Sequence, residues 1–220
     1  MALSSKSVAA APLLEARQLA CKRGRNLLFE GLNLALAAGS VTWLRGTNGS
    51  GKTSLMRILA GLSAPADGQV LWRGTPLAQA GAEARESLLY IGHANALKDD
   101  LTLRESLAYL GRLAGLEDAD ARAAQALQRL GLLSRGQAPV RTLSQGQRRR
   151  GALARLALDD KPRVWILDEP YDALDAPSTQ TLSALITAQA ACGGAVLLTS
   201  HQSVPLAGLV EFDLERVRRP

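Results

Sequence analysis

The alternation of hydrophobic and polar positions divides the chain into strand-like ends and a helical middle. Between residues 13 and 45, short apolar stretches separated by turns occur in "LLEARQLAC", "LLFEGLNLAL" and "SVTWLRG", and "DGQVLWRGTPL" repeats the pattern later. Further along, the apolar positions return at helical spacing, and Ala123, Leu127 and Leu130 share one face. These patterns predict strands on both sides of a mostly helical insertion.

Two nearly continuous apolar runs, "RVWILDEP" and "GAVLLTSH", stand apart from this alternation. A strand without a polar side is typical of a parallel sheet whose two faces are both covered. We therefore predict an α/β fold with a mixed sheet, in a single domain over residues 1–220. The core of this domain is predicted at about 13–96 and 161–205, and an inserted helical subdomain at about 97–160.

Composition places the chain among globular proteins, since 47% of its residues are hydrophobic and 21% are charged. No apolar window of about 18 residues occurs, so the chain is not expected to span a membrane by itself. The opening "MALSSKSVAAAPLLEAR" lacks the apolar region of a signal peptide and is typical of a cytosolic start. Cys21 and Cys192 are far apart and form no CxxC pair, which fits a reducing compartment and argues against a metal or disulfide framework.

The net charge of +6 has two interpretations. A basic surface favours nucleic acid or an anionic membrane as a partner, whereas arginines scattered over solvated faces require no partner. Apart from "QRRR" and "RVRR" the arginines are spread along the chain, and aromatic residues make up only 4%, which leaves little for base stacking. We therefore expect no direct contact with nucleic acid, while proximity to a membrane surface remains compatible with the charge.

The stretch "GTNGSGKT" matches the pattern G-x-x-x-x-G-K-[ST] and lies between an apolar strand and the apolar helix "KTSLMRILAGL". Its glycines allow the backbone N–H groups to form an anion-binding nest at the positive end of that helix. Lys52 is expected to reach the β- and γ-phosphates of a nucleotide, and the Thr53 hydroxyl to ligate Mg²⁺. The predicted nucleotide-binding residues are Gly46, Thr47, Asn48, Gly49, Ser50, Gly51, Lys52, Thr53 and Ser54.

A pair of carboxylates ends the buried strand predicted in "VWILDEP". Asp168 is expected to hold Mg²⁺, directly or through water, and Glu169 to polarise the attacking water as a general base. The alternative is an acidic strand end before a turn at Pro170. The phosphate loop earlier in the same chain favours the catalytic interpretation.

The stretch "LSQGQRRRGALARLAL" predicts a second helix whose N-terminus suits an anion. Ser144 is a good N-cap, Gln147 completes a capping box, and Gly146 leaves room for close approach. A second anion site in one chain suggests that it serves a nucleotide held by another chain. We therefore predict a head-to-tail homodimer that sandwiches two ATP molecules. The alternative is an ordinary capped helix.

The motifs "GTNGSGKT", "LSQGQ", "WILDEP", "ALD" and "LTSH" occur in the order of an ABC-transporter ATPase domain, which the chain resembles from about residue 14 to 201. The resemblance implies a P-loop NTPase core of the ABC-ATPase type, with ATP and Mg²⁺ as cofactors. It also implies that Ser144, Gly146 and Gln147 belong to a signature that touches the partner's γ-phosphate. In the same way, Asp175 would help to couple the two sites across the dimer, and His201 would contact the γ-phosphate and position the water.

Three positions depart from the common pattern of this family. Gln145 replaces a glycine of the signature, and we expect activity to persist if its side chain points away from the nucleotide. The aromatic residue that stacks on adenine is missing, and Arg23 takes its place as a guanidinium able to stack, unless it is simply a solvated arginine in a turn. In "YIGHANALKDDLT" His93 holds the position of the usual glutamine, either beside a water near the γ-phosphate or as a structural residue of a hinge.

Taken together, these stretches resemble one subfamily closely, the CcmA ATPases of cytochrome c maturation, also called haem exporters. The resemblance implies a peripheral protein on the cytoplasmic face of the bacterial inner membrane, bound to integral membrane subunits of the CcmB and CcmC type. ATP hydrolysis would then drive release of a haem-loaded chaperone. The loop at 94–102, with Lys98, Asp99 and Asp100 at its rim, would face the membrane partner, and the alternative is an exposed polar loop without a partner. The alternatives are an ABC exporter ATPase for another substrate, a non-transport ABC ATPase associated with DNA or ribosomes, and a phosphate-loop kinase.

Overall fold

The computed structural model describes residues 11–217, so most of the opening stretch interpreted as a cytosolic start, and part of "RVRR", lie outside the described residues. Among the described residues, no helix has the length and apolar character needed to cross a membrane.

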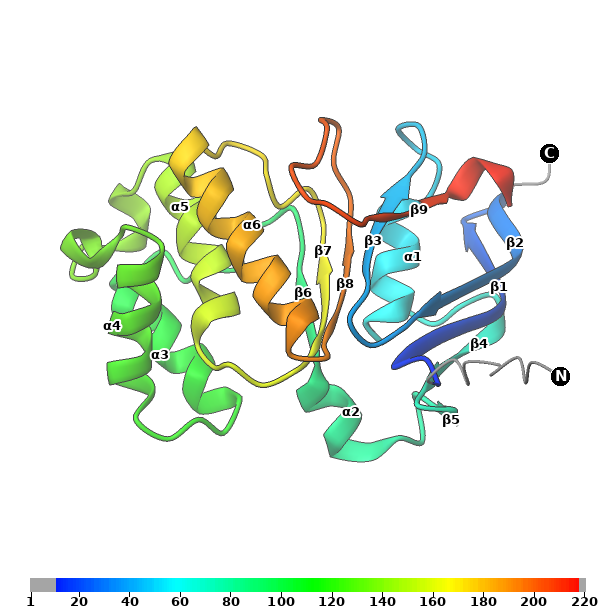
Figure 1. Cartoon of the computed structure of the whole chain (residues 1–220), viewed down its shortest axis with the longest axis horizontal. Coiled ribbons are helices and arrows are strands. Elements are labelled where there is room, and N and C mark those ends of the chain that lie inside the picture. Colours follow the sequence, from blue (N-terminus) through cyan, green and yellow to red (C-terminus); the bar gives the residue numbers. More distant parts are fainter. Residues whose placement is uncertain (1–10, 218–220) are drawn as a thin grey trace, which may run out of the picture.

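A parallel sheet of five strands occupies the centre of the molecule (Figure 1). Its strands, in spatial order, are β6 (Leu88–Ile91), β7 (Val164–Leu167), β8 (Ala195–Leu198), β3 (Val41–Arg45) and β9 (Val210–Asp213). All neighbouring pairs run parallel. Parallel neighbours need crossover connections, and the helical insertion provides the one between β6 and β7.

A second sheet is antiparallel and contains β2 (Asn26–Leu36), β1 (Leu14–Arg23), β4 (Asp67–Trp72) and β5 (Thr75–Pro76), in that order. Helix α1 (Lys52–Leu59) lies between the two sheets (Figure 1). The predicted α/β fold with both parallel and antiparallel strands is confirmed, and the two kinds of pairing are divided between two sheets.

The helices gather mainly on the opposite side of the parallel sheet (Figure 1). Here lie α3 (Leu103–Leu113), α4 (Ala119–Arg129), α5 (Gln145–Leu153) and α6 (Ala176–Ala191). The predicted apolar face of Ala123, Leu127 and Leu130 is confirmed, because all three side chains are buried in one core. After α5 the chain tightens into a 3₁₀ turn over Ala154–Ala157.

The parallel sheet is covered on both faces by separate apolar cores. Alternate residues of β7 point to opposite sides, so Trp165 and Leu167 pack with the helices, while Val164 and Ile166 pack with α1 and the antiparallel sheet. This two-sided burial explains why "VWIL" has no polar position. It also places the carboxyl end of β7, where Asp168 follows, beside the start of α1.

Several elements, among them α2 (Gly81–Ser87), α6 and β9, have no counterpart among the sequence predictions. Helix α2 buries only Ala84, and strand β9 is largely exposed at the edge of the sheet. Neither therefore has the apolar periodicity from which an element is recognised. Strand β9 pairs with β3 and lies beyond residue 205, the predicted limit of the core.

Candidate functional site

The loop between β3 and α1 depends on glycine. Gly49 has a φ of 82° and Gly51 a φ of 104°, conformations that side-chain-bearing residues rarely adopt. At Gly46 a Cβ atom would lie only 2.7 Å from the Ser50 hydroxyl, which is itself buried. Gly51 is the N-cap of α1 and supplies no side-chain cap, so the first turn of this helix has N–H groups to offer an anion.

Lys52 reaches back over this loop. Its Nζ donates to the Gly46 carbonyl at 2.7 Å and to the Thr47 carbonyl at 3.2 Å. The Thr47 N–H in turn donates to the Glu215 carboxylate at 3.1 Å, a contact with the last described turn that no motif indicates. The ammonium group is therefore already held at the mouth of the loop, where a phosphate would meet it.

Asp168 is fixed by two hydroxyl groups. Thr53 Oγ1 donates to Asp168 Oδ2 at 2.9 Å, and Thr199 Oγ1 donates to Asp168 Oδ1 at 3.0 Å. The same Thr199 oxygen accepts the Glu169 N–H at 2.8 Å. Thr199 is completely buried and was missed at the sequence level, because a threonine at a strand end has no motif of its own.

Glu169 has an unusual backbone and a perturbed carboxyl group. Its φ of 48° lies in the left-handed region, which costs a residue with a Cβ roughly 1–2 kcal/mol. Its carboxylate accepts the His201 N–H at 3.1 Å, and His201 Nε2 lies 3.5 Å from its other oxygen. Burial raises the pKa of Glu169, and the negative charges of Asp172 and Asp168 add to this, while His201 opposes it.

These groups line one cavity of about 280 Å³. It brings together residues from β1, β2, the glycine loop and α1, and residues that follow β6, β7 and β8. Arg23 and His93, both exposed, lie on its wall with the residues of the glycine loop and the two carboxylates, and Leu28 is a further lining residue without a sequence signal. The lining residues are Arg23, Leu28, Thr47, Asn48, Gly49, Gly51, Lys52, Thr53, Ser54, His93, Asp168, Glu169 and His201.

The predicted signature residues lie outside this cavity. Ser144 caps α5 by accepting the Gln147 N–H at 3.3 Å, and Gln147 Oε1 accepts the Ser144 N–H at 3.1 Å, so the predicted capping box is confirmed. A Cβ at Gly146 would lie 3.1 Å from the Ala173 carbonyl, so glycine allows close packing there. Asp175 caps α6 by accepting the Ser178 N–H at 3.0 Å and is exposed.

The loop at 94–102 is partly held by the chain itself. Asp99 lies 3.5 Å from Arg148, and Lys98 donates its N–H to the Ser106 hydroxyl at 3.4 Å. The side chains of Lys98 and Asp100 are exposed. These contacts therefore hold part of the loop, while the charges of Lys98 and Asp100 remain exposed.

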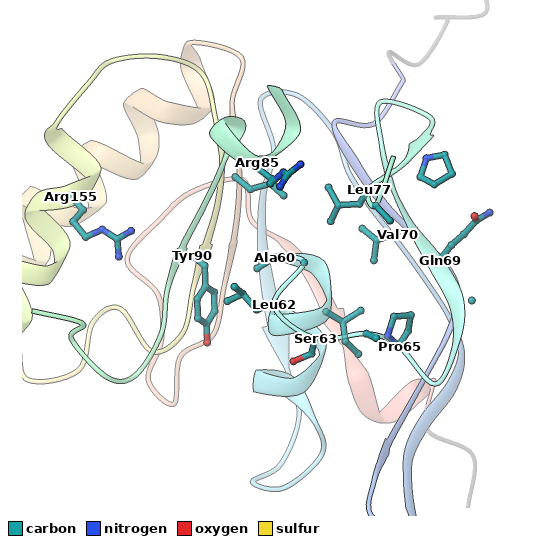
Figure 2. A pocket seen from close by; sticks show the side chains of 17 residues that line it. Ala60, Leu62, Ser63, Pro65, Gln69, Val70, Leu77, Arg85, Tyr90 and Arg155 are labelled. Atoms are coloured by element: carbon teal, nitrogen blue, oxygen red, sulfur yellow. The ribbon is translucent and has the colours of Figure 1, made fainter. Parts of the chain in front are cut away.

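A second and larger cavity, of about 840 Å³, opens near the far end of α1 (Figure 2). Its wall is formed by the end of α1, by β4, β5, α2 and β6, and is largely apolar. Arg85, Tyr90 and Arg155 bring polar groups to it, and burial lowers the pKa of Arg155. No sequence motif indicates this cavity, which is separate from the glycine loop.

Comparison with known proteins agrees with this geometry. The family described as ABC transporter matches residues 29–172. The cytochrome c biogenesis ATP-binding export protein CcmA of Nitrosomonas europaea is 44% identical over 89% of this chain and 91% of its own length. The protein of the same name from Pseudomonas fluorescens is 46% identical over 92% and 96%.

A solved structure has the same fold. It is an ATP-binding cassette, determined as a dimer in a post-hydrolysis state with ADP and Pi, and it matches 86% of this chain and 88% of its own with a TM-score of 0.76 at 20% identity. The chain is therefore an ATP-hydrolysing protein of the ABC transporter family and belongs, within that family, to the CcmA proteins.

Proposed function

We propose that the chain is the ATP-hydrolysing subunit of a membrane ABC complex that acts in haem export and c-type cytochrome biogenesis. The observation that carries the proposal is the cluster at the carboxyl end of β7, where Asp168, Glu169 and His201 face the start of α1. The names of the CcmA relatives support the assignment to cytochrome c biogenesis.

The glycine loop and Lys52 would bind the phosphates of ATP. Lys52 would exchange its loop carbonyl partners for phosphate oxygens without leaving its place, because its Nζ already lies at the loop. Thr53 Oγ1 and the Asp168 carboxylate would hold Mg²⁺, and their 2.9 Å contact places two hard oxygen donors side by side. When bound, Mg²⁺ neutralises charge on the phosphates.

Glu169 would act as the general base toward the attacking water. Its raised pKa and its contacts with His201 suit a carboxylate that takes up a proton in a shielded place. His201 would position that water near the γ-phosphate. Arg23 would stack on adenine, and His93 would contact a water near the γ-phosphate, since both line the same cavity.

The signature residues would complete the site of a second copy. Ser144, Gly146 and Gln147 lie outside the cavity of their own chain, so a head-to-tail homodimer would bring them to the partner's nucleotide. Asp175 would lie near that contact and couple the two sites. The dimeric state of the related ATP-binding cassette supports this arrangement.

The membrane partners would be integral subunits of the CcmB and CcmC type, and the chain would bind peripherally at the cytoplasmic face of the inner membrane. The outward charges of Lys98 and Asp100 would lie at the rim of this contact. No direct contact with nucleic acid is proposed.

The test is release of a haem-loaded chaperone by the purified complex, measured with and without ATP and Mg²⁺. We expect release only with ATP, and none when the chain carries Lys52→Ala. Normal formation of c-type cytochromes in cells whose only copy carries Lys52→Ala would contradict the proposal.

A further inference from the structure

Arg149 is the most deeply buried cation for which the structure gives an exposure, with only 4% of its surface exposed. It belongs to α5, two positions after Gln147 of the capping box. A buried arginine is expensive unless its donors are satisfied. Arg149 is therefore not one of the solvated arginines of a basic surface, and its donors must be satisfied inside the protein.

The guanidinium of Arg149 crosses from α5 to the ends of two strands. Its Nη2 donates to the carbonyls of Asp168 at 2.8 Å and Glu169 at 2.6 Å. Its Nη1 donates to the Gly92 carbonyl at 3.0 Å and lies 3.5 Å from Asn95 Oδ1. One side chain thus binds the backbone that carries the metal ligand and base, and the backbone next to His93.

The position of Glu169 depends on these contacts. Its left-handed backbone is held on one side by Thr199, which accepts its N–H, and on the other by Arg149, which donates to its carbonyl. Neither contact uses the Glu169 carboxylate, so both leave it available for chemistry. Loss of the Arg149 contact would release one of the two restraints on a backbone that is otherwise unfavourable.

We propose that Arg149 is a positioning residue, which links the orientation of α5 to the placement of Glu169 and of the loop at His93. The proposal rests on the proposed function of Glu169 as general base. Because α5 also carries Ser144 at its N-terminus, a shift of this helix when a second chain binds is transmitted through Arg149 to the carbonyls of Asp168 and Glu169.

The chemistry of the contact requires arginine. A planar guanidinium presents several donors in fixed directions and can serve carbonyls from two strands at once, whereas a lysine ammonium is a point charge on a flexible stem. The Nε of Arg149 is buried without a hydrogen-bond partner. The position of the side chain therefore leaves one of its own donors unsatisfied. Burial lowers the pKa of Arg149, and the negative charges of Asp172, Asp168 and Glu169 oppose this by favouring the charged guanidinium.

The first test is Arg149→Lys in the full-length chain, purified together with any membrane subunit that co-purifies. We expect kcat for ATP hydrolysis to fall at least tenfold, while KM and the Kd for ATP change less than threefold, because Lys52 and the glycine loop are untouched. The matched control is Arg122→Lys in α4, whose guanidinium also donates to two carbonyls, those of Glu117 and Leu158, away from the cavity.

Arg122→Lys is expected to leave kcat unchanged after correction for the folded fraction. If kcat fell equally in Arg149→Lys and Arg122→Lys, or if Arg149→Lys raised KM and left kcat unchanged, Arg149 would have a merely structural role and the proposal would be overturned. A wild-type chain that hydrolyses no ATP would instead contradict the proposed function, so the two failures are distinguishable.

The second test combines Arg149→Lys with Glu169→Gln in single-turnover hydrolysis with enzyme in excess. If Arg149 acts through Glu169, its replacement has less than a twofold effect once the base is gone, and the effects are not additive. The same fold loss in the presence and absence of the Glu169 carboxylate overturns the proposal.

Discussion

The two helix N-termini with which this chain is expected to bind phosphate, those of α1 and α5, are built in opposite ways. Helix α1 begins at Gly51, which has a left-handed backbone and no capping side chain. Helix α5 begins at Ser144, whose side chain forms a complete capping box with Gln147. Neither helix has an acidic residue in its first turn, so both present an uncompensated positive end.

This difference indicates a division of work. The uncapped end of α1 needs an external anion to satisfy its N–H groups, and it faces the cavity that contains Lys52. The end of α5 satisfies part of its own N–H groups and lies outside that cavity, so it is stable without a nucleotide. The difference is therefore what we expect if the end of α1 binds the nucleotide first and the end of α5 closes on it later.

The largest effect is expected when the phosphate site at the start of α1 is disrupted. Lys52→Ala should lower ATP hydrolysis by at least about a hundredfold, because an aligned cation at the phosphates is lost. Hydrolysis and nucleotide binding are measured by phosphate release and calorimetry. Arg57→Ala is the control, since it removes an exposed cation from the last turn of the same helix. Normal hydrolysis by Lys52→Ala would rule out the assigned phosphate site.

A second prediction tests whether the two ends meet across a dimer. Glu169→Gln should reduce hydrolysis by about two orders of magnitude while ATP binding persists, because the base is lost and the phosphate contacts stay. ATP should then trap the dimer, which size-exclusion chromatography with light scattering detects. A variant that stays monomeric with ATP and Mg²⁺ would leave the end of α5 without a nucleotide to bind.

The α5 side is tested by Ser144→Ala, which should lower hydrolysis about tenfold and leave ATP binding to α1 unchanged. Mixing this variant with Lys52→Ala should restore activity, because one site of each mixed head-to-tail dimer then has both residues intact. Rates that merely add would place both residues in the same site.

The control for Ser144→Ala is Thr102→Ala. Thr102 forms an equivalent capping box with Glu105 at the start of α3, through contacts of 3.2 and 2.8 Å. It therefore loses the same kind of cap, which contributes about 1 kcal/mol, away from the cavity. Equal losses of activity in the two variants would reduce Ser144 to an ordinary cap.

Both helix N-termini could be predicted from the sequence. The end of α1 was predictable because its glycines, Lys52 and Thr53 are adjacent in the chain, and the end of α5 because a capping box spans four residues. The fold class followed from two apolar strands buried on both faces. Each of these signals is local, and the structure confirms the elements that they predicted.

The contacts that hold the site together were not predictable in this way. Thr199 reaches Asp168 across the sheet, and Arg149 reaches Glu169 from another layer, so each contact joins segments that are far apart in sequence. In "QRRR" the three arginines have the same chemistry, and only packing makes Arg149 buried while Arg148 and Arg150 stay partly exposed. Tertiary approach, and not local pattern, decides which of them acts.

The smallest expected effect concerns the electrostatics of the α1 side. Glu169 must be ionised to act as a base, so kcat/KM should fall as the pH decreases through its pKa. Burial raises the pKa of Glu169, and the negative charge of Asp172 adds to this, so Asp172→Asn should lower the pKa and move the acid limb of the pH profile to lower pH. Asp160→Asn, in an exposed pair with Arg129, is the control and should leave the limb in place.

The direction in which the acid limb moves shows whether the titrating group lies on the α1 side or on the α5 side of the site. A neutral residue at 172 removes repulsion from the Glu169 carboxylate, so the ionised base persists to lower pH. The α5 capping box, formed by Ser144 and Gln147, contains no titratable side chain that could cause the same movement. If the limb moved to higher pH, or moved equally in Asp160→Asn, the titrating group would not be Glu169. A shift found only in Asp172→Asn would assign the proton acceptor to the end of β7, beside the phosphates held by α1.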